Sequence, residues 1–151
     1  MRAQMYLAIA LAGALTLVGV SARASCRLDD AMKAFGLCES DIDWHDAHAA
    51  LTDCKAAGMA FRACRADSVA YSSLDARHRD ELEYYIAYSQ FGVAGAEAHS
   101  ATTEDDAARA RRDFFAARVG FEKVIAEGDL PQWMMKAAKL IVRTIDANEP
   151  R

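Results

Sequence analysis

The sequence predicts an all-α fold: a single small antiparallel helical bundle of five to six helices, whose N-terminal part is stapled by two disulfides. Alanine, the residue with the highest helix propensity, occurs 33 times among the 151 residues. The β-branched residues that favour strands are sparse. Apolar side chains recur instead every three or four residues in six segments, which is the spacing of one face of a helix.

Residues 1–24 have the layout of a secretory signal peptide. The basic residue Arg2 precedes an apolar run over residues 5–20, and Ala22 and Ala24 form the small-x-small pattern that signal peptidase recognises. As a helix that run would span about 24 Å, which is short of a hydrocarbon core of about 30 Å. We therefore expect cleavage after Ala24, no stable membrane insertion afterwards, and a single all-helical domain over residues 25–151.

The charge of the mature chain restricts its partners. The leader contains Arg2 and Arg23 and no acidic residue, so the mature chain would carry 16 basic and 22 acidic side chains, a net charge of −6. This charge favours solubility and disfavours nucleic acid or an anionic membrane as a partner. Together with the leader it predicts a periplasmic or secreted protein whose partner is another protein.

Two glycines divide the predicted helices of the N-terminal part. Gly36 is expected to end a first helix over residues 28–35, because glycine is common just beyond a helix C-terminus. A second helix is expected over residues 39–57, with Ser40 and Asp43 near its start and Gly58 as the turn that follows. A short third helix would then contain Phe61 and Cys64.

The four cysteines lie close together, at Cys26, Cys38, Cys54 and Cys64. An even number in an exported chain predicts two disulfides, and no Cys-x-x-Cys pattern suggests zinc instead. If residues 39–57 form one helix, Cys38 and Cys54 lie about 24 Å apart and cannot be joined. We therefore expect Cys26–Cys38 and Cys54–Cys64. The alternative is a nested pairing, Cys26–Cys64 and Cys38–Cys54, with the residues between Cys38 and Cys54 forming a loop.

Three longer helices are expected in the rest of the chain. Each begins at a residue suited to capping: Ser72, Thr103 and Asp129. The helix from Ser72 should run to about residue 98, and the next should end at Gly128. The fifth and sixth helices each have one clear apolar stripe, made of Ala107, Ala110, Phe114, Ala117, Phe121 and Ile125 in the fifth and of Leu130, Met134, Ala137 or Ala138, Ile141 and Ile145 in the sixth.

The fourth helix differs because it has two apolar stripes. The first contains Leu82, Tyr85, Ile86, Ser89 and Val93, and the second contains Tyr84, Tyr88 and Phe91. A helix that is apolar on two sides either lies at the centre of a bundle or presents one side to a partner. Tyrosine and phenylalanine are enriched at protein interfaces. We therefore take Tyr84, Tyr88 and Phe91 as candidate partner-binding residues, with the central position as the alternative.

A polar cluster offers a different kind of site. Asp41, His45 and His48 stand at i, i+4 and i+7, so they share one face of the second helix as predicted. Imidazole and carboxylate are common ligands of transition metals. Three such residues on one straight helix span about 10 Å, so a metal would also need ligands from another helix. A metal- or cofactor-binding bundle that uses His45 and His48 is thus the alternative function.

Catalytic motifs are missing from the sequence. There is no Gly-x-Ser-x-Gly, glycine-rich phosphate loop or His-Glu-x-x-His, and cysteines in disulfides cannot act as nucleophiles. We therefore expect no enzyme, no cofactor and no metal. The leading hypothesis is a small exported helical protein that acts by protein–protein binding, such as an inhibitor, an immunity protein or an accessory protein.

Overall fold

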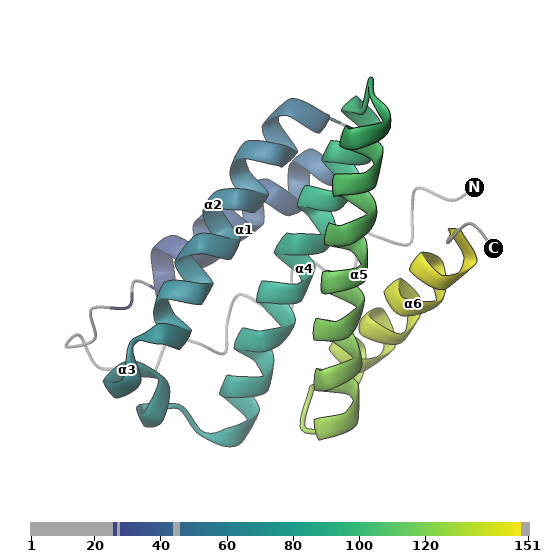
Figure 1. Cartoon of the computed structure of the whole chain (residues 1–151). Helices are drawn as coiled ribbons and strands as arrows, with labels where there is room; N and C mark the ends of the chain where they lie inside the picture. Colours follow the sequence, from purple (N-terminus) through teal and green to yellow (C-terminus); the bar gives the residue numbers. More distant parts are fainter. Residues whose placement is uncertain (1–25, 27, 44–45, 149–151) are drawn as a thin grey trace.

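The computed structural model of the chain describes Cys26, residues 28–43 and residues 46–148. Within these residues the fold is all-α, as predicted, and contains no strand (Figure 1). The predicted signal peptide, residues 1–24, lies outside the described part. The helices are α1 (Leu28–Asp43), α2 (Ala47–Ala66), α3 (Ser68–Ser73), α4 (Ala76–Ser100), α5 (Glu104–Glu127) and α6 (Gln132–Asn148).

Helix α4 lies at the centre of the bundle. It packs along α2 on one side and along α5 on the other, while α1 packs mainly on α2 and α6 packs on α5 (Figure 1). Between Glu81 and Ala96 its buried residues point in every direction around the helix axis. Of the two interpretations of the two apolar stripes, the alternative one, a central position for the helix, is therefore confirmed.

The first two helices do not end where the sequence predicted. Helix α1 continues through Gly36 to Asp43, and α2 begins at Ala47 and continues through Gly58. The prediction of breaks at the two glycines was wrong. Asp46 determines the start of α2, because its side chain accepts a hydrogen bond from the Ala49 N–H at 3.0 Å. Gly58 lies inside α2 because the helix passes close to α4 there.

The disulfides have the nested connectivity, Cys26–Cys64 and Cys38–Cys54. The local pairing that we favoured was wrong, because it required one helix over residues 39–57 and the chain changes helix within that range. In the antiparallel α1–α2 hairpin each bridge joins residues that lie side by side, with Cα atoms 4.6 Å apart in both. The two bonds indicate an oxidising compartment.

The later helices begin or end close to the predicted residues. Thr103 and Asp106 form a reciprocal capping box at the start of α5, and Gly128 ends that helix in the left-handed conformation, with φ 79°. The cap of α4 is Asp75 rather than Ser72, since Asp75 accepts from the His78 N–H and Ser72 belongs to α3. Helix α6 begins at Gln132, after Pro131, and not at Asp129.

Small residues allow the central helix to approach its neighbours closely. A Cβ added to Gly58 of α2 would lie 3.3 Å from the Cβ of Ser89 in α4. A Cβ added to Gly120 of α5 would lie 2.9 Å from the Cβ of Ala87, on another side of α4. Close crossings of this kind bury large areas of both backbones. The alanine-rich and glycine-containing faces are therefore contact surfaces between helices.

None of the helices in the described residues combines the length and the apolar character that crossing a bilayer requires.

Candidate partner-binding surface

Tyr84, the first residue of the predicted binding stripe, lies in the core. Its side chain is 2% exposed. Its ring makes edge-to-face contacts with Phe121 of α5 at 5.7 Å and with Trp133 of α6 at 6.4 Å between ring centroids. Burial raises the pKa of its phenol well above the ordinary value. Tyr84 thus joins α4 to α5 and α6, and a binding surface on this stripe has to rest on Tyr88 and Phe91.

Tyr88 and Phe91 are half-buried and belong to a series of rings that crosses three helices. Tyr88 contacts Phe35 of α1 at 5.2 Å, and Phe91 contacts Phe114 of α5 at 5.7 Å. The rings of Tyr88 and Phe91 lie 6.3 Å apart. We call these four residues the aromatic band. Phe35 is the buried member of the band, whereas Tyr88, Phe91 and Phe114 are partly exposed.

The aromatic band contrasts with the remaining aromatic residues that these helices enclose. Phe61 and Phe121 are completely buried, and Tyr85 stacks on Phe61 at 5.3 Å. Burial also raises the pKa of Tyr85, with a smaller contribution from the charge of Glu81. The fold therefore encloses several of its large rings and leaves Tyr88, Phe91 and Phe114 at the boundary between core and solvent. The sequence could not separate Phe114 from Phe121, because both belong to the same predicted stripe of the fifth helix.

The histidine cluster is only partly described. His45 lies outside the described residues, and His48 is exposed as the second residue of α2. Asp41 lies on α1, not on the helix of His48, so the common helix face that we predicted does not exist. The pKa of Asp41 is raised, first by burial and then by a hydrogen bond with Asp53. Metal binding through His45 and His48 stays a prediction.

Among the described residues, no group of three or more His, Cys, Asp and Glu side chains is placed so that it could hold a metal ion.

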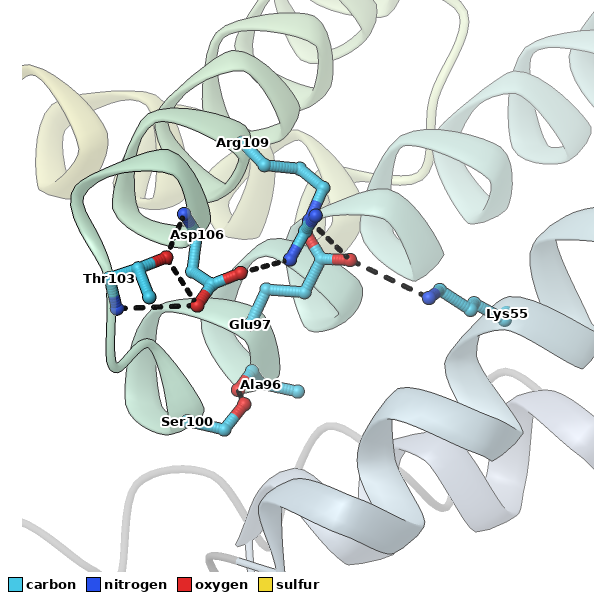
Figure 2. Close-up of polar contacts among 7 residues, drawn as sticks. All are labelled: Lys55, Ala96, Glu97, Ser100, Thr103, Asp106 and Arg109. Carbon is cyan, nitrogen blue, oxygen red and sulfur yellow. Dashed lines mark hydrogen bonds and ion pairs between the residues drawn. The ribbon is translucent and has the colours of Figure 1, made fainter.

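A polar cluster that the sequence did not indicate joins three helices near the α4–α5 loop (Figure 2). Glu97 of α4 forms one ion pair with Lys55 of α2 at 3.5 Å and another with Arg109 of α5 at 3.8 Å. Arg109 also binds Asp106 at 2.6 Å, and Asp106 belongs to the capping box. The evident role of the cluster is to connect the disulfide-linked hairpin to the α4–α5 pair.

Acidic residues near the other end of α4 are also partly enclosed. Glu81 is buried and pairs with Arg77 at 3.2 Å, and Glu83 pairs with Arg65 of α2 at 3.0 Å. The pKa of Asp80 is raised to about 6, mainly by burial and then by a hydrogen bond with Glu127 at the end of α5. Each buried glutamate therefore has a cation beside it that compensates its charge.

Comparison of the chain with protein-family models, with curated proteins and with solved structures finds no match in any of the three.

Proposed function

We propose that the protein is exported and acts by binding another protein through Tyr88 and Phe91, with Phe114 beside them. An inhibitor, an immunity protein or an accessory protein would work in this way. The observation that carries the proposal is the aromatic band, in which three rings from two helices remain partly exposed although neighbouring rings are completely buried.

The geometry of the band suits binding. Tyrosine and phenylalanine bring a large contact area and have few rotatable bonds, so ordering them on binding costs little entropy. Phe35 lies against Tyr88, and Phe114 lies against Phe91, so each ring is already supported by a neighbour. The helix that carries Phe35 is joined to α2 by the Cys38–Cys54 disulfide, and Cys26, just before that helix, is joined to α2 by the Cys26–Cys64 disulfide. A partner would therefore meet a largely preformed surface.

Export of the protein can be measured directly, through its location in the cell and its N-terminal residue. The leader-like residues 1–24 and the two disulfides both support it. Cell fractionation with N-terminal sequencing should recover the protein outside the cytoplasm, beginning at Ser25. Full-length protein that stays in the cytoplasm with free thiols would contradict export.

The binding surface can be tested by photo-crosslinking in the exporting cell. A photoreactive phenylalanine derivative is introduced in place of Tyr88 or Phe91, and adducts are identified by mass spectrometry. We expect one protein to be captured from both positions, because both rings would lie in the same contact. Matched controls carry the same group in place of Met59 and Val69, which are exposed apolar residues on α2 and α3.

A binding variant completes this test. Phe91→Ser should abolish co-purification of the captured protein while thermal unfolding under non-reducing conditions still shows a folded bundle, because the ring is only half-buried. Adducts of equal yield from Met59 and Val69, or a partner that Phe91→Ser still binds, would show that the aromatic band is not the binding surface.

A further inference from the structure

Helix α5 has a second face that no other described helix covers. One side of α5 packs on α4 and α6 through Ala110, Ala117, Phe121 and Val124. On the opposite side Phe115 is 54% exposed and Val119, one turn later, is 48% exposed. These two residues belong to a line spaced by four and three residues, which we call the outer stripe and which consists of Ala108, Arg112, Phe115, Val119, Glu122 and Ala126.

The outer stripe has the geometry of a coiled-coil seam. At about 100° per residue its six members fall within about 40° of one line along the helix. Alternating steps of four and three residues place successive side chains toward a single partner helix. All of these residues are exposed except Ala108, which is half-buried. The face is thus continuous over five turns of α5.

The order of residues in the outer stripe is self-complementary. Its midpoint is residue 117, and members at equal distances from that midpoint match in size or charge. Two residues on either side of the midpoint are Phe115 and Val119, which are both large and apolar. Five residues away stand Arg112 and Glu122, which have opposite charges, and nine residues away stand two alanines. A twofold axis brings residue i against residue j and residue j against residue i, which is the relation this order satisfies.

We infer that the protein forms a homodimer in which α5 of one protomer packs antiparallel against α5 of its partner. Phe115 then contacts Val119 of the partner subunit, and Arg112 pairs with Glu122 of the partner subunit. The two Phe–Val contacts form the apolar centre of the interface. The two Arg–Glu pairs determine the register, since a shift of one turn would break them. Ala108 and Ala126 allow the ends of the helices to approach closely.

The ion pairs within each protomer are compatible with this arrangement. Arg112 has no ion-pair partner among the described residues. Glu122 lies 3.2 Å from Arg118, and Arg118 also binds Asp146 of α6 at 2.8 Å. When Glu122 turns toward the partner's Arg112, Arg118 therefore keeps a carboxylate. The nearby cations Arg109 and Lys123 remain paired with acids of their own protomer.

The opposite charges of Arg112 and Glu122, at equal distances from the midpoint, favour a second copy over an unrelated partner as the occupant of this face. An unrelated partner would require only that the stripe match that partner. A match between the two halves of the stripe is required only when the same stripe lies on both sides of the interface. The interface is also distinct from the aromatic band, so it does not depend on the proposed function.

Sedimentation of the oxidised, leader-free protein tests the apolar centre. We expect a dimer whose dissociation constant rises about a hundredfold in Phe115→Glu, because two charged side chains would enter the middle of the interface. Val69→Glu is the matched control, since Val69 is 74% exposed on α3, and it should leave the dimer unchanged. Circular dichroism should show that both variants remain folded.

Charge exchange tests the register. Arg112→Glu and Glu122→Arg should each weaken the dimer about tenfold, because each places like charges together twice. An equimolar mixture of these two variants should associate as a heterodimer with the original affinity, since every cross pair then has opposite charges. A monomer at millimolar concentration before any substitution, a dimer that survives Phe115→Glu, or a mixture that stays as weak as its components would each overturn the inference.

Discussion

Gly92 of α4 lies against the Cys38–Cys54 disulfide of the α1–α2 hairpin. A Cβ at this position would lie 2.6 Å from the Sγ of Cys54, 2.9 Å from the Cδ1 of Ile42 and 3.3 Å from the Sγ of Cys38. The Cys38–Cys54 bridge therefore packs directly on the α4 backbone. Any side chain at Gly92 would have to push α1 and α2 away from the central helix.

We predict that Gly92→Ala lowers the free energy of unfolding by about 1–3 kcal/mol, the usual cost of overpacking a close contact. The disulfide cannot swing aside as a flexible side chain would. Gly95→Ala, one turn later on the same helix, is the matched control because a Cβ there meets nothing within 4 Å. It should stabilise the protein by about 0.5–1 kcal/mol through helix propensity. Urea unfolding without reductant measures both, and changes of the same sign would contradict the close contact.

Asp80 should make stability depend on pH. The pKa of this carboxyl group is raised from 3.8 to about 6 in the folded protein, first by burial and then by Glu127 and Asp129. At pH values between these two pKa values, the Asp80 carboxyl group binds its proton more tightly in the folded state than in the unfolded state. The ionised carboxylate is therefore the less favourable form, and its contribution to stability falls as the pH rises through this window.

Asp80→Asn removes the ionisation and keeps a group that can donate a hydrogen bond to Glu127. After allowance for solvent screening, we expect a gain of about 0.5–1 kcal/mol in the free energy of unfolding at about pH 7.5 and no gain at about pH 4. Urea unfolding at the two pH values gives the comparison. A gain of equal size at both would show that the effect is not electrostatic.

Among the elements, α2, α4 and α5 are connected by the two ion pairs of Glu97. Its side chain is 10% exposed, while those of Lys55 and Arg109 are about half exposed. The Oε2 atom of Glu97 is buried and makes no hydrogen bond within the described part of the chain. The carboxylate is therefore the buried member of the cluster, and Lys55 and Arg109 are exposed enough to be hydrated when Glu97 is substituted.

We predict that Glu97→Gln lowers the free energy of unfolding by about 1–2 kcal/mol. The substitution removes the charge that attracts both cations, and its amide would be partly buried without an acceptor. Glu104→Gln is the control, because Glu104 is an exposed acid in the first turn of α5. The control should cost less than about 1 kcal/mol. Equal losses of unfolding free energy in the two variants, measured by urea unfolding, would show that the ion pairs of Glu97 do not stabilise the packing of the three helices.

The positions of the helix ends show which helix boundaries the local sequence predicts correctly and which it does not. Thr103 with Asp106 and Gly128 marked the ends of α5 correctly, because a capping box and a left-handed glycine act on the backbone beside them. Gly36 and Gly58 misled the prediction for α1 and α2. A glycine within a helix costs only about 1 kcal/mol, which packing of Phe35, Cys38 and Phe61 in the core readily outweighs.

At the scale of the whole molecule, the central position of α4 decides which residues are available for binding. The second apolar stripe of α4 faces the space between α1 and the α5–α6 pair. Tyr84 lies where α6 reaches across to it, through Trp133, and is buried. Tyr88 and Phe91 lie further along α4 and remain partly exposed. One stripe of uniform spacing is thus divided between core and surface by the placement of α6.

The sequence by itself determined the all-α class, the apolar faces of α5 and α6 and the presence of two disulfides. These follow from propensity, periodicity and parity, which depend on residues near one another in the chain. Only the tertiary structure decided the nested pairing of the cysteines, the burial of Tyr84 and the contact of Glu97 with Lys55 and Arg109. Each of these depends on which helices pack side by side, and that is determined by contacts between residues far apart in the sequence.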